Sequence, residues 1–482
     1  MSWNDLREWM TEVDSLGELC LVEGASWQED IGHITEMLDH NAGAPCVLFD
    51  RIPDYEPGRR VIVNCNGTRR RQAITLGMPP EAASHHALME RWRGILNQLK
   101  PLGPETVKDG PVMENVVEGD DVDLERFPAP QWHPKDGGRF LGTASVNIMR
   151  DPDSNWVNLG TYRNQILGRR RLGIWISPGK HGRLIRGSYF ERGERCPVVV
   201  VVGSDPLLFW SACAEGIPYG LGELDWAGGV RQRPVEVIEG PLTGLPIPAT
   251  AEIALEGFMT PGLEQVEGPY GEWTGYYASG TPTVPVIEVE AVYHRDDPII
   301  VGCPQGKPPH EDNQFLAYLK SNLIRQQIEA AGVSGVTDVW CPAQGGNRLL
   351  VIVALRQKYA GHSRQVAHVA AQCGAAAYNG RYVIVVDDDI DIYNLSDVLW
   401  AVLTRSDPAA DIEFIRRAWS SPLDPMVPAG AVPINSRAII DATIPWERKE
   451  TFAEPIVSKE QARKTVEKWG YILDKRRTTD DS

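Results

Sequence analysis

The segment Asn155-Trp156-Val157-Asn158-Leu159-Gly160-Thr161-Tyr162-Arg163-Asn164-Gln165 stands out among the 482 residues of this chain. It lies near the start of residues 140–302, where the pattern of apolar residues is typical of strands. Apolar runs such as Val198 to Val202, and alternating runs such as Val286 to Tyr293, recur there between turns rich in glycine and proline. This pattern favours a β-rich barrel or sandwich for the middle of the chain.

The sequence on either side alternates helix and strand signals. Before the central region, apolar residues at helical spacing predict a helix over 4–16. Further elements are expected there as strands at Val47 to Phe49 and Val61 to Val63, and as a long helix over 84–99. After the central region we expect helices near 314–330 and 363–373, strands at Leu349 to Val353 and Tyr382 to Val386, and a terminal helix from Ser458 to Leu473. The strand at 382–386 is expected to be buried on both faces, as in an α/β sheet.

Segments that carry proline and glycine near 101–111 and 127–138 indicate a domain boundary. We therefore expect a small α/β N-terminal domain over 1–110, a β-rich central domain over 111–305, and a C-terminal α/β domain with a terminal helix over 306–482. The last residues, from Lys475, are expected to fray.

The composition limits the classes of function. A formal net charge of −17 argues against a nucleic acid or an anionic membrane as the main partner. No run of 18 apolar residues predicts a membrane span, and the first residues lack the features of a secretory signal. The eight cysteines contain no CxxC pair, so reduced thiols and a cytoplasmic location are expected. The Arg69-Arg70-Arg71 run is interpreted as a solvated or ion-paired helix face.

Residues that could carry chemistry gather in a few short segments. Besides the opening segment, these are Pro178-Gly179-Lys180-His181-Gly182, Gly222-Glu223-Leu224-Asp225 and Glu267-Gly268-Pro269-Tyr270-Gly271-Glu272. Each alone is a weak signal, because an isolated histidine is more often structural and Gly-Pro-Tyr-Gly is usually only a turn.

Together these segments supply the groups that a metal and a carboxylic acid need. An asparagine oxygen, an imidazole nitrogen and a carboxylate form a mixed site suited to Mn²⁺ or Mg²⁺, with positions left open for a phosphate oxygen. Arg163 offers a planar fork that can hold a carboxylate through two hydrogen bonds. Glu267 and Glu272 bracket a turn that could direct both side chains into one cleft.

These segments resemble the signature of the UbiD family of prenylated-FMN-dependent (de)carboxylases. The resemblance extends over nearly the whole chain, and the spacings agree: five residues from Asn158 to Arg163, eighteen from Arg163 to His181 and five from Glu267 to Glu272. It also includes Asn64-Cys65-Asn66-Gly67-Thr68-Arg69-Arg70-Arg71 with Leu76-Gly77, Val385-Val386-Asp387-Asp388-Asp389-Ile390-Asp391, and Asp441-Ala442-Thr443.

The resemblance implies a fold and a set of roles. The central domain would be a split β-barrel that binds the flavin, and the C-terminal α/β domain would serve oligomerisation. Asn158, His181 and Glu223 would ligate the metal that holds the flavin phosphate. The flavin would be lined by Asn158, Leu159, Gly160, Thr161, Tyr162, Arg163, Lys180, His181 and Glu223, with Arg381 as a basic phosphate contact. Trp156 and Ala212 would offer carbonyl oxygens to a K⁺ ion.

The activity implied is the reversible, non-oxidative decarboxylation of an aromatic, heteroaromatic or α,β-unsaturated acid through a covalent substrate adduct with prenylated FMN. Arg163, Glu267 and Glu272 would be the catalytic residues. Arg163 would hold the substrate carboxylate and pair with an ionised Glu267. Glu272 would donate the proton after CO₂ leaves, which requires a setting that raises its pKa.

The resemblance also implies a flavin prenyltransferase that supplies the cofactor, and a homodimer or homohexamer with the C-terminal domain and tail at the interface. Candidates for the substrate pocket are Tyr276, Tyr277, Pro304, Gln305, Lys307 and His310.

Three alternatives remain open from the residues alone. One is a split-barrel flavin oxidoreductase that uses ordinary FMN, and another is a catalytically silent scaffold. The third is a metal-dependent phosphatase built on the acids of residues 387–391. For those acids we favour a solvated loop that caps the next helix, near 393–403.

Overall fold

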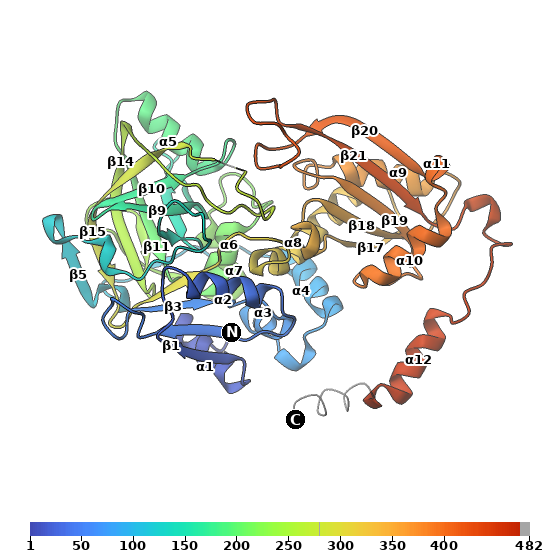
Figure 1. Cartoon of the computed structure of the whole chain (residues 1–482), viewed down its shortest axis with the longest axis horizontal. Coiled ribbons are helices and arrows are strands. Elements are labelled where there is room, and N and C mark those ends of the chain that lie inside the picture. Colours follow the sequence, from blue (N-terminus) through green and yellow to red (C-terminus); the bar gives the residue numbers. More distant parts are fainter. Residues whose placement is uncertain (279, 473–482) are drawn as a thin grey trace. The chain divides into compact units, whose positions relative to one another are not determined.

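The structure is a computed structural model that describes residues 1–278 and 280–472 (Figure 1). The chain divides into two compact units. The first comprises Met1–Leu323, Cys341–Asn347 and Ser420–Ile434. The second comprises Ile324–Trp340, Arg348–Trp419 and the described residues from Asn435 onward. The expected boundaries at residues 110 and 305 stay predictions.

The N-terminal part of the first unit is a small α/β layer. Its sheet has the order β1-β2-β3-β16, and helices α1 to α4 come from the same part of the sequence. The bounds are α1 Leu6–Ser15, β1 Leu19–Glu23, α2 Asp30–Asp39, β2 Cys46–Asp50, β3 Arg60–Val63, α3 Arg69–Thr75, α4 His85–Gln98 and β16 Ile299–Gly302. The predictions for 4–16, 47–49, 61–63 and 84–99 are confirmed. Strand β16 pairs in parallel with β3 and comes from much later in the sequence.

The Arg69-Arg70-Arg71 run begins helix α3, whose N-cap is the side chain of Thr68. Arg70 and Arg71 each bind Glu18, at 2.8 and 2.9 Å. The prediction of an ion-paired helix face is therefore confirmed for these two residues. Arg71 is not at the surface, however, because its side chain is fully buried.

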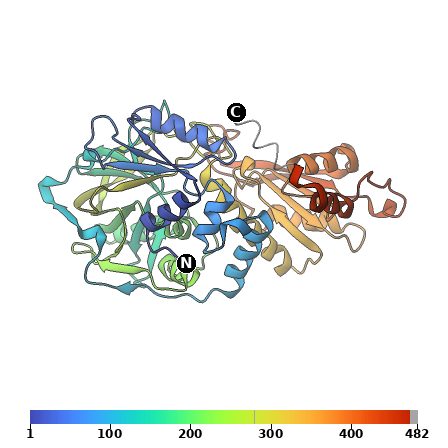
Figure 2. The ribbon, with the colours of Figure 1, turned by 90° about the horizontal axis from the view of Figure 1, so that it is seen from below.

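A strongly curled half-barrel sheet forms the body of the first unit (Figures 1 and 2). Its order is β6-β9-β10-β15-β14-β11-β7-β8, with β5 added on β15. The bounds are β5 Asn115–Glu118, β6 Phe140–Gly142, β7 Val146–Arg150, β8 Val157–Gly160, β9 Arg163–Gly168, β10 Arg171–Trp175, β11 Cys196–Val202, β14 Ile253–Val266 and β15 Thr283–His294. The first unit also contains α5 His181–Glu191, α6 Pro206–Cys213, α7 Glu223–Arg231 and a small sheet of β4 Glu105–Thr106, β12 Glu236–Glu239 and β13 Pro246–Pro248.

The apolar run in β11 exists because both faces of this strand are covered. Val198, Val200 and Val202 belong to a core that also contains residues of the N-terminal layer. Val199 and Val201 belong to a second core, together with residues of α6 and α7. Successive side chains of a strand point to opposite faces, so a strand between two cores has no polar positions.

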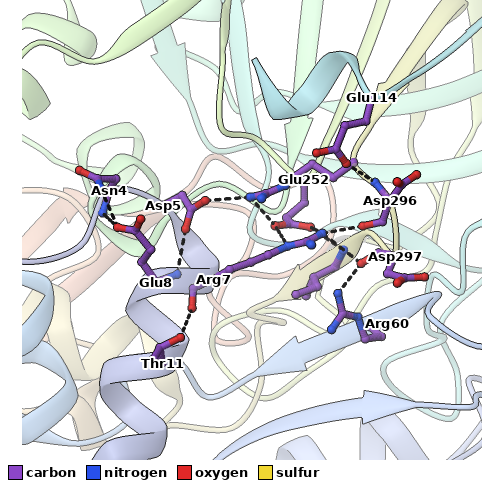
Figure 3. Close-up of polar contacts among 12 residues, drawn as sticks. Asn4, Asp5, Arg7, Glu8, Thr11, Arg60, Glu114, Glu252, Asp296 and Asp297 are labelled. Atoms are coloured by element: carbon purple, nitrogen blue, oxygen red, sulfur yellow. Dashed lines mark hydrogen bonds and ion pairs between the residues drawn. The ribbon is translucent and has the colours of Figure 1, made fainter.

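A buried ion network fixes helix α1 to the start of β14 (Figure 3). The side chain of Glu252 is fully buried and accepts bonds from Nε and Nη2 of Arg7, at 2.9 and 2.8 Å. Arg295 joins the same network, with Nη1 at 2.8 Å from Asp5 and 3.4 Å from Glu252. Paired in this way, the Glu252 carboxylate has partners for both of its oxygens inside the core.

The second unit is an α/β layer built on a sheet of order β17-β18-β19-β21-β20. The bounds are β17 Val336–Trp340, β18 Leu350–Leu355, α9 His362–Gln372, β19 Tyr382–Asp387, α10 Leu395–Arg405, α11 Pro408–Asp411, β20 Ile412–Trp419, β21 Ile434–Ala442 and α12 Lys459–Trp469, preceded in sequence by α8 Glu311–Ala330. Strands β18, β19 and β21 are parallel, and most of β19 is buried as predicted, although Tyr382 is exposed. Leu473 and Lys475, part of the expected tail, lie outside the described residues.

The acids at the end of β19 and directly after it are ion-paired, so the solvated loop expected there is confirmed only for Asp391, which is exposed. Nη1 and Nη2 of Arg405 bind the two carboxylate oxygens of Asp389, at 2.8 and 2.6 Å. Asp387 is only 7% exposed and lies 3.3 Å from the same guanidinium. The N-cap of α10 is Asn394 rather than one of these acids. Residues 387–389 are therefore explained by ion pairing within the unit.

Over the described residues, none of the helices is long and apolar enough to cross a membrane.

Candidate active site

Arg163 forms the centre of the candidate site. It is the first residue of β9, and its guanidinium holds two glutamates that lie more than 100 positions later in the sequence. Nε and Nη2 bind the two carboxylate oxygens of Glu267 at 2.6 and 2.8 Å, which is the forked geometry expected of arginine. Nη1 binds Glu272 at 2.5 Å. The three side chains are at most 8% exposed.

Two aromatic rings enclose this guanidinium. Its Cζ lies 5.3 Å from the ring centroid of Trp175 and 5.0 Å from that of Tyr270, within the range of cation–π contacts. Burial alone would lower the pKa of Arg163, but its hydrogen bonds and the charges of Glu267 and Glu272 raise it above the usual value. The guanidinium therefore stays charged in a largely apolar surrounding.

The sequence reasoning missed both rings. Trp175 is the last residue of β10, and it pairs directly with Arg163 in the sheet. Tyr270 lies inside the motif that contains both glutamates, where it was interpreted only as part of a turn. Burial, and then the charge of Asp136, raise the pKa of Tyr270, so this phenol stays neutral.

The turn that carries the glutamates begins directly after β14 ends at Val266. Gly268 adopts a φ of +80°, a left-handed conformation that favours glycine. The amide of Glu267 donates to the Pro282 carbonyl at 2.9 Å, and the amide of Glu272 donates to the Tyr276 carbonyl at 3.0 Å. The turn is therefore bonded at both of its ends.

A second group of predicted residues assembles around strand β8. The Glu223 side chain, at the start of α7, accepts from Nδ2 of Asn158 at 2.9 Å and from the Leu159 amide at 2.7 Å. Asn158 and Glu223 are 3% and 5% exposed. Burial raises the pKa of Glu223 to about 7.

His181 begins helix α5, which packs against the same strand. The neighbouring Gly182 amide donates to the hydroxyl of Tyr162 at 3.1 Å. Burial raises the pKa of Tyr162, and the charge of Glu223 contributes to the same rise. Burial, and then the charge of Lys180, lower the pKa of His181, which leaves its imidazole neutral.

The donors of this second group fit a divalent cation. Oδ1 of Asn158 is buried and has no hydrogen-bond partner among the described residues. The Glu223 carboxyl is bonded to the same asparagine, and the His181 ring packs against Trp156, which directly precedes β8, with ring centroids 5.1 Å apart. An amide oxygen, a neutral imidazole and a carboxylate are ligands of the kinds that divalent metals bind. The described residues contain no metal-holding group of three or more His, Cys, Asp and Glu side chains, but the predicted set includes an amide and is of a different type.

The remaining residues that were predicted to line the flavin or to bind K⁺ have different surroundings. Oγ1 of Thr161 lies 3.3 Å from Sγ of Cys213, and a side chain at Gly160 would collide with the Tyr162 ring. The Trp156 carbonyl already accepts from the Asp151 amide at 2.8 Å. The predicted contacts of Trp156 and Ala212 with K⁺ stay predictions. Arg381 lies in the second unit, directly before β19, so its contact with the flavin phosphate also stays a prediction.

Family models match three consecutive parts of the chain. They are described as the N-terminal, Rift-related and C-terminal domains of 3-octaprenyl-4-hydroxybenzoate carboxy-lyase, and they match residues 10–92, 105–308 and 314–442.

Two curated proteins are similar over nearly the full length. One is a phenolic acid decarboxylase of Escherichia coli O157:H7, 29% identical over 99% of this chain and 100% of that protein. The other is an uncharacterized protein of Archaeoglobus fulgidus, 30% identical over 92% of this chain and 93% of that protein.

Two solved structures are similar along the chain. The vanillic acid decarboxylase of Sedimentibacter hydroxybenzoicus, in an open form, superposes with a TM-score of 0.86 at 26% identity, covering 98% of this chain and 100% of that one. The UbiD-class enzyme HmfF of Pelotomaculum thermopropionicum, in complex with FMN, gives 0.83 at 27% identity, covering 94% and 97%. By these matches, the chain belongs to the UbiD family and is a carboxy-lyase.

Proposed function

We propose that this carboxy-lyase binds prenylated FMN and catalyses the reversible, non-oxidative decarboxylation of an aromatic, heteroaromatic or α,β-unsaturated carboxylic acid. The single observation that carries the proposal is the buried guanidinium of Arg163 held between Glu267 and Glu272. The similarity to a phenolic acid decarboxylase and a vanillic acid decarboxylase supports an aromatic acid as substrate. The similarity to HmfF, whose structures contain FMN or, in an evolved dimeric form, prFMN, supports the flavin.

Arg163 would bind the substrate carboxylate. Two of its nitrogens, Nε and Nη2, are already engaged by Glu267, which fixes the plane of the guanidinium. Nη1 faces Glu272, so this nitrogen is the donor that an incoming carboxylate can share. A planar guanidinium that is fixed on Glu267, with Nη1 shared between Glu272 and the substrate, orients a carboxylate better than a point charge does.

Glu272 would deliver the proton to the carbon that loses CO₂. A carboxyl group can do so only when it is protonated and within hydrogen-bond reach of the reacting atom. Glu272 is 4% exposed and is bonded to Arg163. Because the same arginine would bind the substrate carboxylate, Glu272 would lie beside the substrate. Glu267 would stay ionised as the partner of the arginine, so two carboxyl groups on one turn would have different roles.

Asn158, His181 and Glu223 would hold Mn²⁺ or Mg²⁺, and the metal would bind the phosphate of the flavin. The unpartnered Oδ1 of Asn158 supports this role. When bound, the prenylated flavin supplies the electron sink that no protein side chain offers to a carbanion on an sp² carbon. The proposal also includes a K⁺ ion near Trp156 and Ala212. A flavin prenyltransferase would supply the cofactor, and the enzyme would be a homodimer or homohexamer.

The test is expression with and without a flavin prenyltransferase. The flavin extracted from each sample is identified by its spectrum and mass, and aromatic and acrylic acids are screened for CO₂ release. We expect a prenylated flavin, and activity only in the co-expressed sample.

The variant Glu272→Gln, purified from the same co-expression, is the matched control, because it should keep the flavin and lose turnover. Plain FMN with NADH oxidation and no CO₂ release would instead support the flavin oxidoreductase alternative.

A further inference from the structure

The turn over residues 267–272 is held from outside by two buried side chains. The Gly268 amide donates to Oε1 of Gln165 at 2.8 Å. The Gly271 amide donates to Oδ1 of Asp136 at 3.0 Å. The two acceptors are 4% and 6% exposed, so water does not compete for these bonds.

These two bonds lie beside the two glutamates. Gly268 directly follows Glu267, and Gly271 directly precedes Glu272. Each acceptor therefore restrains the backbone next to one of the two carboxyl groups. An amide bonded to a buried acceptor cannot rotate without leaving that acceptor unsatisfied, which costs roughly 1–3 kcal/mol.

Gln165 acts from the same strand as the arginine. Residues two apart on a strand share a face, so Arg163 and Gln165 both point from β9 toward the turn. Nε2 of Gln165 also donates to the Gly137 carbonyl at 3.1 Å. The Gly137 amide in turn donates to the Pro269 carbonyl at 2.8 Å, which closes the connection back to the turn.

The segment over residues 133–137 and the turn over residues 267–272 are in direct contact. A Cβ atom on Gly137 would lie 1.8 Å from the Gly268 oxygen, and one on Gly271 would lie 2.7 Å from Nδ1 of His133. Oδ2 of Asp136 accepts from the His133 amide at 3.0 Å, so this carboxylate fixes its own loop as well as the turn.

We propose that Asp136 and Gln165 are positioning residues for the reaction, Asp136 for Glu272 and Gln165 for Glu267. The proposal rests on the proposed function for the roles of the two glutamates. Through Glu267, Gln165 sets the orientation of Arg163 and therefore the binding of the substrate carboxylate. Through Glu272, Asp136 sets the point at which the proton is delivered.

This division predicts different kinetic effects for two variants. Asp136→Leu, which keeps the shape and removes both acceptors, should lower kcat about 10- to 100-fold with KM little changed, because a displacement of ~1 Å at a reacting group has effects of this size. Gln165→Met, of similar length, should chiefly raise KM, by roughly 10-fold, because it loosens a group that binds substrate. Flavin content should equal that of the wild type in both.

The matched control is Tyr293→Phe. It removes a buried hydrogen bond of 2.8 Å to Glu256, in the same pair of long strands but away from the turn. It should lower the melting temperature without changing kcat or KM by more than about twofold, because it removes one bond outside the site. If Asp136→Leu does not fold, Asp136→Asn is a milder substitute. Whichever way its amide is oriented, the NH₂ group faces either the Gly271 or the His133 backbone N–H, so one of the two hydrogen bonds is lost.

A second readout is independent of activity. Hydrogen–deuterium exchange of a peptide covering residues 266–276 should speed up at least about 10-fold in both variants and not in Tyr293→Phe, because only they release the turn amides. Unchanged exchange, or equal kinetic changes in all three variants, would overturn the proposal. If the wild type releases no CO₂ from any acid, the proposed function fails and the exchange result alone decides whether the turn is held in this way.

Discussion

Replacing Arg163 by lysine separates the role of the fork from the role of the charge. Arginine makes three short bonds here, two to Glu267 and one to Glu272. A lysine ammonium keeps the positive charge but cannot bind both oxygens of one carboxylate in a plane while also reaching the other carboxylate. We therefore expect Arg163→Lys to lose at least one charge-assisted bond and the fixed orientation of the group.

The magnitude follows from the burial of the group. Hydrogen bonds to charged groups contribute roughly 1.5–3 kcal/mol each, and the arginine side chain is only 8% exposed, so solvent screening reduces this little. A loss of about 3 kcal/mol of transition-state stabilisation corresponds to a decrease in kcat/KM of roughly 100-fold. The assay is CO₂ release by enzyme preparations matched for flavin content.

Arg405→Lys provides the matched control, because this arginine also forks on a carboxylate, that of Asp389, in the second unit. It should lower the melting temperature and leave kcat/KM within about twofold of the wild type, because it lies outside the proposed site. If Arg163→Lys kept kcat/KM within threefold of the wild type, the fork would have no catalytic role and the reasoning would be refuted.

The remaining predictions concern other carboxyl groups. Glu272→Gln should retain the flavin, by absorbance, and abolish turnover, because the amide has no acidic proton to give; loss of the flavin as well would indicate a structural role. Glu223→Ala should empty the flavin site, measured as flavin and metal per chain after desalting, since a metal ligand would be missing; full occupancy would contradict the metal assignment. Glu252→Gln should lower the free energy of unfolding by about 2 kcal/mol, which is below the roughly 3–5 kcal/mol of a fully buried broken pair because Arg7 is 32% exposed; an unchanged melting temperature would show that the network contributes nothing. Burial raises the pKa of Glu311 to about 7, so its contribution favours the folded state below the unfolded pKa near 4.5 and is lost as the pH rises through 7; Glu311→Gln should flatten the melting temperature between pH 5 and pH 8, and an equally steep profile would count against this.

Much of the fold could be predicted because its pattern is local. The valine run of β11 and the helical spacing around α1 identify their elements within a few residues. The pairing of β16 with β3 could not be predicted, because the two strands are more than 200 residues apart in the sequence. Neither strand contains a residue pattern that indicates which strand it pairs with.

The site was predictable only in part, for a related reason. The motif identified Arg163, Glu267 and Glu272, and the structure brings these three side chains together. Gln165 and Asp136 carry no signal of their own, because a buried amide or carboxylate that bonds a backbone amide looks the same in the sequence as an exposed one. The segment after β19 was misjudged in the same way, since Arg405 lies 16 positions after Asp389.

The buried arginine also constrains the charge that can enter with a substrate. With both glutamates ionised, the three side chains carry one net negative charge in a site that is nearly closed to water. An anionic acid would raise this to two around the one guanidinium, and such an excess is unfavourable at low dielectric. Under the proposed chemistry, a proton taken up together with the acid removes this excess. Binding then consumes the same proton that Glu272 later gives to the product, so substrate capture and proton loading become one step.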